Sequence, residues 1–220
     1  MFRFFVEDKI GNTFKLSKEI IKHIKVARVE KENFICIYKE IFFICQLDNE
    51  QAIIIKELNE NHEFSKQIII AAAFIDTKRF EWLIQKAAEL GATKLIPVLS
   101  QNVSKKIPSD INKKIQRWNQ ISLNASEQSF RNKQLIVSQP MKFNDVINIK
   151  ITNKYIAHEK EKSTTEISFP QDSIFLIGPE GGFSEKEVIN ASVKGYKIIS
   201  LGKRILRAET ASIFIMSRIN

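Results

Sequence analysis

The sequence predicts an α/β domain built on a parallel sheet, preceded by a small antiparallel β-barrel. Residues 2–58 hold short runs of β-branched and aromatic residues at close spacing, which is typical of a small barrel. Beyond residue 66, apolar strand-like runs alternate with amphipathic helix-like runs, which favours a parallel sheet covered by helices. We therefore expect two domains, 1–65 and 66–220, that meet in a short polar segment.

The first domain is expected to contain four strands and one helix. Ser17 has the chemistry of an N-cap, and Glu19 lies in the first turn of a helix expected over 17–27. The apolar residues of this helix fall on one face. The strands predicted around it are 2–6, 33–38, 41–47 and 51–57.

The second domain begins with the continuous apolar run 67–74, which predicts a strand buried on both faces. An amphipathic stripe predicts that a helix over 77–90 follows. Ser184 and Glu187 form a capping-box pattern at the start of another expected helix. The other predicted elements are helices over 110–127 and 185–194 and strands over 94–99, 134–137, 154–157, 173–177 and 197–201.

The chain is basic, with 34 Lys and Arg against 25 Asp and Glu, a net charge of +9. This excess favours polyanionic partners such as nucleic acid or an acidic membrane surface, although a lysine-rich composition explains it equally well. Cys36 and Cys45 lie in apolar runs and are expected to behave as small hydrophobic residues. Without a signal-like or membrane-spanning stretch, we expect a cytoplasmic protein.

Two glycine-bearing loops, 177–184 and 201–211, each follow a strand-like run and precede a helix-like run. Because open α/β sheets bind ligands at the carboxyl ends of their strands, the loops predict one shared pocket. The first loop has neither the P-loop ending nor the GxGxxG spacing. Taken alone, it is equally typical of a tight connection between a strand and a helix.

The second loop carries three polar residues at an expected helix start. Thr210 would serve as a cap, and Glu209 would offset the helix dipole. Arg207 has neither explanation, which indicates a functional group.

On these residues the chain resembles the ribosomal RNA small-subunit methyltransferase E family, of the SPOUT class of knotted methyltransferases. Both loop motifs, Gly-Pro-Glu-Gly-Gly at 178–182 and Ile-Leu-Arg-Ala-Glu-Thr-Ala at 205–211, are highly specific for it. The resemblance departs at 101–103, where Gln-Asn-Val replaces the family's Arg-Ser-Val. Further matches are Lys78, Arg79, Trp82, 85–91, Pro97, Arg117, Trp118, 125–129 and Arg131.

The resemblance implies a PUA-like amino-terminal barrel that holds RNA and a carboxy-terminal domain with a trefoil knot. General rules of chain topology would not predict a knot. It also implies a homodimer that binds S-adenosylmethionine, without a metal, and forms N3-methyluridine in 16S ribosomal RNA of the small (30S) subunit. The rivals are a non-catalytic RNA-binding assembly factor and a methyltransferase that acts on transfer RNA or another base.

The resemblance also implies site residues. Arg207 is expected to stabilise the uracil anion, and Glu209 to act as the base or to orient Arg207, unless both bridge the dimer. The cofactor contacts are expected from Leu176, Gly178, Glu180, Gly181, Gly182, Leu201, Gly202, Ile205, Leu206, Thr210 and Ala211. The RNA contacts are expected from Lys78, Arg79, Lys86, Gln128 and Arg131.

Alternatives remain for the RNA contacts. Lys78 and Arg79 open a helix, where cations oppose the dipole, so a nearby anion would explain them as well as a solvated helix start does. Arg131 would also fit an i,i+4 ion pair with Glu127.

Overall fold

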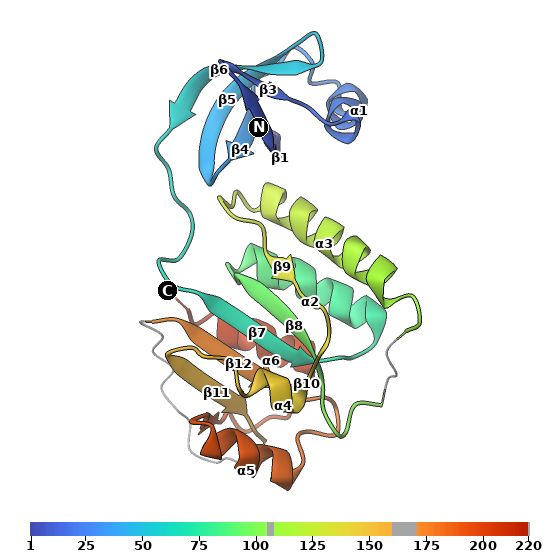
Figure 1. The fold of residues 1–220 in the computed structure, drawn as a ribbon, viewed down its shortest axis with the longest axis vertical. Coiled ribbons are helices and arrows are strands. Elements are labelled where there is room, and N and C mark those ends of the chain that lie inside the picture. The colour runs from blue at the N-terminus through green and yellow to red at the C-terminus, as the bar shows by residue number, and fades with distance from the viewer. Residues whose placement is uncertain (105–107, 160–170, 220) are drawn as a thin grey trace. The chain divides into compact units, whose positions relative to one another are not determined.

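The computed structural model describes residues 1–104, 108–159 and 171–219, and the chain folds into two compact units (Figure 1). The first unit contains residues 1–63 together with 126–134, and the second contains residues 64–125 and 135–220. The stretch 126–134 thus belongs to the first unit, although it lies far along the chain from the rest of it.

The first unit is built on a six-stranded half-barrel sheet in the order β1-β4-β5-β6-β3-β2. β1 pairs with β4 in parallel, and the other neighbouring strands are antiparallel. The strands are β1 (Arg3–Phe5), β2 (Asp8–Ile10), β3 (Thr13–Lys15), β4 (Phe34–Tyr38), β5 (Ile41–Asp48) and β6 (Gln51–Leu58). All four predicted strands are present, within an open sheet that has one parallel edge.

Helix α1 (Lys18–Ala27) buries Ile21 and Ile24 in the core of the first unit. The Ser17 hydroxyl accepts a hydrogen bond from the Ile20 amide at 3.2 Å, which confirms the predicted N-cap. The hairpin of β2 and β3 was not predicted, because every residue of β2 is exposed and the strand shows no apolar alternation.

Residues 126–134 join the first unit through an aromatic contact and a buried ion pair. The rings of Phe42 and Phe130 stack with their centroids 4.7 Å apart. Nη2 of Arg131 lies 2.5 Å from Oε2 of Glu63, and their side chains are only 4% and 6% exposed. Arg131, predicted to contact RNA, is therefore enclosed by protein and paired with a carboxylate of the first unit.

The second unit contains a seven-stranded parallel sheet, as predicted, in the order β10-β8-β7-β12-β11-β13, with β9 also paired to β8. Its strands are β7 (Ile68–Ala73), β8 (Lys94–Leu99), β9 (Ile136–Val137), β10 (Met141–Lys142), β11 (Asn153–Ala157), β12 (Ser173–Ile177) and β13 (Lys197–Ile199). Every residue of β7 and β12 is buried, as expected for central strands covered on both faces.

Helices cover both faces of this sheet (Figure 1). One face packs against α2 (Thr77–Glu89), α3 (Ile111–Gln128) and α6 (Ala208–Met216) through residues such as Phe80, Trp118 and Ile215. The other packs against α4 (Phe143–Val146) and α5 (Glu185–Val193) through Phe143 and Val188. The predicted capping box at the start of α5 is present, formed by Ser184 and Glu187.

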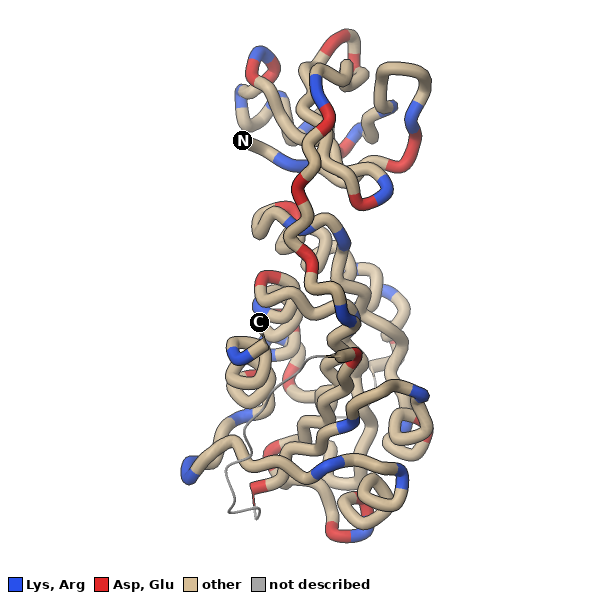
Figure 2. Tube along the Cα trace, turned by 90° about the vertical axis from the view of Figure 1, so that its left-hand side faces the viewer, with Lys and Arg blue, Asp and Glu red and all other residues tan. Residues whose placement is uncertain are grey.

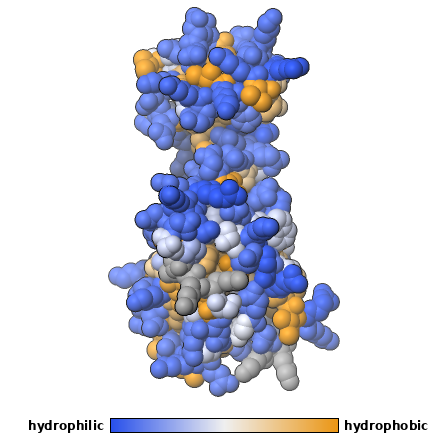
Figure 3. Space-filling view, turned by 90° about the vertical axis from the view of Figure 1, so that its right-hand side faces the viewer, coloured by the Kyte–Doolittle hydropathy of each residue, from blue (hydrophilic) through white to orange (hydrophobic). Residues whose placement is uncertain are grey.

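Charged residues of both signs are spread along both units (Figure 2). The face drawn in Figure 3 is mostly hydrophilic, with small separate hydrophobic patches. None of the helices in the described ranges has the length and apolar character needed to cross a membrane.

Candidate cofactor-binding site

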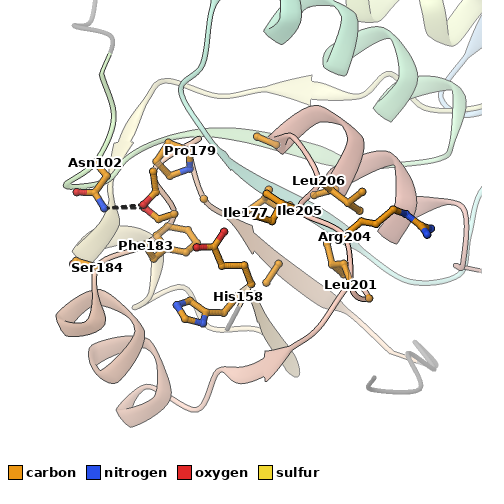
Figure 4. Close-up of a pocket in the computed structure, with 18 of the residues that line it drawn as sticks. Asn102, His158, Ile177, Pro179, Phe183, Ser184, Leu201, Arg204, Ile205 and Leu206 are labelled. Carbon is orange, nitrogen blue, oxygen red and sulfur yellow. Dashed lines mark hydrogen bonds between the residues drawn. The ribbon is translucent and has the colours of Figure 1, made fainter. Parts of the chain in front are cut away.

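A pocket of about 330 Å³ lies at the carboxyl ends of β11, β12 and β13, a volume within the usual range for small-molecule sites (Figure 4). Both glycine-bearing loops line it, which confirms the prediction of one shared pocket. The lining residues are Asn102, Ala157, His158, Glu159, Ile177, Gly178, Pro179, Gly181, Gly182, Phe183, Ser184, Glu185, Leu201, Gly202, Arg204, Ile205, Leu206, Ala208 and Ala211.

The first glycine loop turns sharply between β12 and α5. The Gly182 amide donates a hydrogen bond to the Pro179 carbonyl at 2.8 Å, which closes the turn. Gly182 has a φ of +64°, a conformation that glycine adopts without the steric cost of a side chain. The chain then enters α5 at Ser184, so the loop presents backbone groups to the pocket.

The loop that follows β8 supports the first glycine loop. Nδ2 of Asn102 donates to the carbonyl oxygens of Gly181 and Gly182 at 3.2 and 3.1 Å (Figure 4). The backbone amide of Gln101 donates to Oε1 of Glu187 at 2.8 Å. The two positions at which the sequence departs from the family pattern therefore contact the glycine loop and the helix behind it.

The second glycine loop runs from β13 to α6. Gly202 has a φ of +106°, which strongly favours glycine. Leu201 and Leu206 contribute apolar surface to the pocket, and Ile205 is 82% exposed. The loop ends at Arg207, whose carbonyl accepts the first hydrogen bond of α6 from Ala211 at 2.8 Å.

A third segment of the lining follows β11. Ala157, His158 and Glu159 line the pocket, and the His158 amide donates to the Ile199 carbonyl at 3.1 Å. The sequence analysis missed this segment because it contains no glycine motif. The available signal was positional: β11 pairs in parallel with β12 and β13, so their carboxyl ends share one edge.

Arg79, on the first turn of α2, binds two carboxylates next to the pocket. Its Nε and Nη2 donate to the two oxygens of Glu209 at 2.8 and 2.6 Å, and its Nη1 donates to Glu180. These hydrogen bonds to Glu209 and then Glu180 raise the pKa of Arg79 above its ordinary value. Arg79 was predicted to contact RNA, and in the structure each of its three nitrogens donates a hydrogen bond to a carboxylate of the same chain.

Most of the predicted cofactor residues line the pocket: Gly178, Gly181, Gly182, Leu201, Gly202, Ile205, Leu206 and Ala211. Three lie elsewhere. Leu176 is fully buried in the core on the face that packs α4 and α5, and the Glu180 carboxylate binds Arg79. Thr210 is exposed on α6, outside the lining.

The predicted catalytic pair is not brought together as a pair. Arg207 is exposed, and within residues 1–104, 108–159 and 171–219 its side chain makes no hydrogen bond or ion pair. Glu209 is 6% exposed, and both of its carboxylate oxygens accept hydrogen bonds from Arg79. The carboxylate of Glu209 thus faces Arg79 and not Arg207.

The remaining predicted RNA contacts differ in availability. Lys78 and Gln128 are exposed. Lys86 is partly buried, and its ammonium binds both oxygens of Glu89 at 2.8 Å.

The lining suits a ligand that combines apolar and cationic parts. Ile177, Phe183 and Leu206 supply apolar surface, and the glycine loops supply backbone donors and acceptors. Glu159 and Glu185 add carboxylates that attract positive charge.

Comparisons with known proteins agree with this site. A family model described as an RNA methyltransferase domain matches residues 62–220. The ribosomal RNA small subunit methyltransferase E of Mesomycoplasma hyopneumoniae is 40% identical over 225 residues, covering 99% of this chain and 98% of the relative.

Solved structures are also similar over nearly the whole chain. The Neisseria gonorrhoeae ribosomal RNA small subunit methyltransferase E, bound to S-adenosyl methionine, has a TM-score of 0.89 at 27% identity, covering 99% of this chain and 95% of that one. A Legionella pneumophila structure in complex with the same bound cofactor has a TM-score of 0.87 at 30% identity, covering 98% and 95%.

The parallel sheet, the pocket at its carboxyl edge and the matching family model define an RNA methyltransferase. Within that class, the chain belongs to the ribosomal RNA small subunit methyltransferase E family.

Proposed function

We propose that this protein transfers a methyl group from S-adenosylmethionine to N3 of a uridine in the 16S ribosomal RNA of the small subunit. The observation that carries the proposal is the convergence of two family-specific glycine loops on one pocket. A non-catalytic RNA-binding factor would have no need of such a pocket.

The residues of the pocket fit this cofactor. When bound, S-adenosylmethionine supplies an electrophilic methyl group on a positively charged sulfonium. The carboxylates of Glu159 and Glu185 favour its positive charge, and Ile177 and Phe183 shield the ligand from water. Transfer of the methyl group would be a direct displacement, so the principal task of the loops would be to hold donor and acceptor in line.

Arg207 is the residue assigned to the uridine. Uracil N3 is a poor nucleophile until its proton is lost to solvent, so the site requires a group that stabilises the resulting anion. Arg207 is exposed and lies between Leu206 and Ala208, which both line the pocket. Its planar guanidinium can donate two hydrogen bonds to a uracil oxygen or to a flanking phosphate.

The RNA is expected to contact basic and polar groups of both units. Lys78 is an exposed cation at the start of α2, and Gln128 is exposed at the end of α3. The six-stranded half-barrel of the first unit is assigned as the PUA-like RNA-binding domain that the family resemblance implies. The substrate is then 16S ribosomal RNA in the 30S subunit, in the cytoplasm.

The family resemblance supports two further proposals about architecture. Helix α6 follows the last strand and packs against α2 and β7 at the beginning of the second unit, and the first proposal is that the chain leading to it is threaded into a trefoil knot. Ile205 is 82% exposed at the pocket, as expected if a second copy of the chain covers it in a homodimer.

The proposal is tested by incubating purified protein with 30S subunits that lack the modification and methyl-labelled S-adenosylmethionine. Mass spectrometry of the nucleosides should find N3-methyluridine in 16S ribosomal RNA. A methyl group on another nucleoside, or only in transfer RNA, would refute the proposed substrate.

The Arg207→Ala variant tests the assigned role. Loss of one preorganised donor to the anion should reduce the transfer rate by about 100-fold or more. The dissociation constant for S-adenosylmethionine should stay within about threefold, since only transition-state stabilisation is removed. An equal loss of both quantities would show that Arg207 is structural.

A further inference from the structure

Arg79 connects two segments that both belong to the cofactor site. Glu180 lies in the first glycine loop, and Glu209 lies on the first turn of α6, directly after the second loop. These partners are 101 and 130 residues from Arg79 in the chain. One side chain outside the pocket therefore binds the first loop directly and the helix that follows the second loop.

The geometry of this contact is specific to arginine. The guanidinium uses Nε and Nη2 on one carboxylate and Nη1 on the other, so donors along two edges of one planar group are engaged. A lysine ammonium is a single point charge and cannot hold two carboxylates in a fixed planar arrangement.

The position of Arg79 requires an electrostatic explanation. The first turn of α2 carries Lys78 and Arg79 and no acidic residue, although the positive end of the helix dipole disfavours cations there. The carboxylates of Glu180 and Glu209 offset this cost. The nearby anions that would explain a basic helix start are therefore supplied by the protein itself.

The burial of the three side chains differs. The side chain of Glu209 is 8% exposed, that of Arg79 is 28% exposed and that of Glu180 is 50% exposed. The contact with Glu209 anchors Arg79 in the protein interior. The contact with Glu180 extends to the surface, on the first glycine loop.

We propose that Arg79 is a positioning residue. Through Glu180 and Glu209 it fixes the position of the two cofactor-binding loops relative to each other. This inference rests on the proposed function, because it assumes that the pocket binds S-adenosylmethionine. Arg79 itself lies outside the lining and acts through the loops. Weakening either contact should lower affinity for the cofactor without removing any group that touches it.

The experiment measures S-adenosylmethionine affinity by calorimetry for the wild type, Arg79→Lys and Glu180→Gln. Arg79→Lys should bind the cofactor roughly tenfold more weakly, the effect expected from one lost charge-assisted hydrogen bond. Glu180→Gln should bind it roughly threefold more weakly, because an ion pair with a half-exposed carboxylate contributes below about 1 kcal/mol. Because the carboxylate of Glu180 is half exposed, Glu180→Gln should fold normally, even if Arg79→Lys does not. The double variant should bind the cofactor no more weakly than the more affected single variant, because both substitutions disrupt the same contact between Arg79 and Glu180.

Arg117→Lys is the matched control. Arg117 also binds a carboxylate through two donors, Nε and Nη2, at 2.7 and 2.9 Å from the oxygens of Glu81. This pair links α3 to α2 and includes no residue of the pocket lining. The control should keep the affinity of the wild type, and an equal loss in the control would overturn the proposal.

Kinetics separate positioning from a structural or RNA-binding role. For Arg79→Lys the KM for S-adenosylmethionine should rise about tenfold, while kcat at saturating cofactor stays within about threefold. A fall in melting temperature with a matching fall in kcat would indicate a structural residue. A higher KM for RNA with normal cofactor affinity would indicate an RNA contact, and either result overturns the inference.

The two proposals fail in different ways. If the wild type does not bind S-adenosylmethionine, the proposed function fails, and the inference fails with it. If the wild type binds and both variants bind equally well, only the inference is overturned.

Discussion

Asn102 holds Gly181 by hydrogen bonding and by close packing together. Its Nδ2 donates to the Gly181 carbonyl oxygen at 3.2 Å, and a Cβ atom added at Gly181 would lie 3.3 Å from Cβ of Asn102. The same amide also binds the Gly182 carbonyl. The positions of these two carbonyls therefore depend on a side chain from the loop that follows β8.

This contact predicts that two substitutions at Asn102 weaken cofactor binding to different extents. Asn102→Ala removes both hydrogen bonds and should weaken S-adenosylmethionine binding by about 1 kcal/mol, or roughly fivefold. Asn102→Asp has the same shape but presents an acceptor to two carbonyl oxygens, so it should bind more weakly still. Calorimetric titration with the cofactor measures both, and an affinity for Asn102→Asp equal to that of the wild type would contradict the assignment.

A second prediction concerns the conformation of Gly202. Nothing lies within 4 Å of a Cβ added there, so the effect of Gly202→Ala is conformational and not a clash. Holding alanine at a φ of +106° costs about 1–3 kcal/mol, and the loop should shift to relieve this strain. We expect cofactor affinity to fall roughly tenfold together with a lower melting temperature.

Gly195→Ala is the control for this prediction. Gly195 has a φ of +84° and equally open space around its Cβ position, but it follows α5 outside the pocket lining. The variant should lose stability and keep its cofactor affinity. If both variants lose affinity alike, the effect of Gly202→Ala reflects general destabilisation.

The fold of the second unit was predictable because its strands are buried on both faces. Continuous apolar runs predicted β7 and β12, and the capping box predicted α5. Local patterns failed where elements are short, as in β10 and α4, which contain two and four residues. The glycine loops were predictable because glycine and proline mark the places where the backbone turns sharply.

The partners within the site could not be predicted from local sequence. The ion pair of Arg79 and Glu209 joins residues far apart in the chain. Only the parallel sheet and the packing of α6 on α2 bring them together. The dipole argument did show that Lys78 and Arg79 call for an anion. It could not show that the anion for Arg79 is a carboxylate of this same chain.

A third prediction tests the structural role of Arg131. Arg131→Ala leaves the carboxylate of Glu63 buried without its guanidinium partner, which should lower the free energy of unfolding by about 3 kcal/mol. Lys133→Ala is the control, since Lys133 and Glu40 are 48% and 58% exposed and such pairs contribute below about 1 kcal/mol. Urea denaturation followed by circular dichroism measures both. Similar losses in the two variants would contradict the buried-pair assignment.

The last prediction concerns Glu127 and the dependence of stability on pH. Burial raises the pKa of Glu127 to about 7, although a hydrogen bond from the Phe5 amide at 3.0 Å opposes the shift. In the unfolded chain a glutamate has a pKa of about 4.3. Between these values the folded protein keeps a proton that the unfolded chain has released, so the free energy of unfolding falls as the pH rises.

Glu127→Gln should remove this fall, because glutamine does not ionise and its carbonyl can still accept the Phe5 amide. The variant should match the wild type near pH 4.5 and exceed its free energy of unfolding by about 3 kcal/mol at pH 8. Urea titrations across this range measure the difference, with the exposed Glu32→Gln as control. The control should retain the fall seen in the wild type. If Glu127→Gln retains it too, the buried carboxyl is not its source.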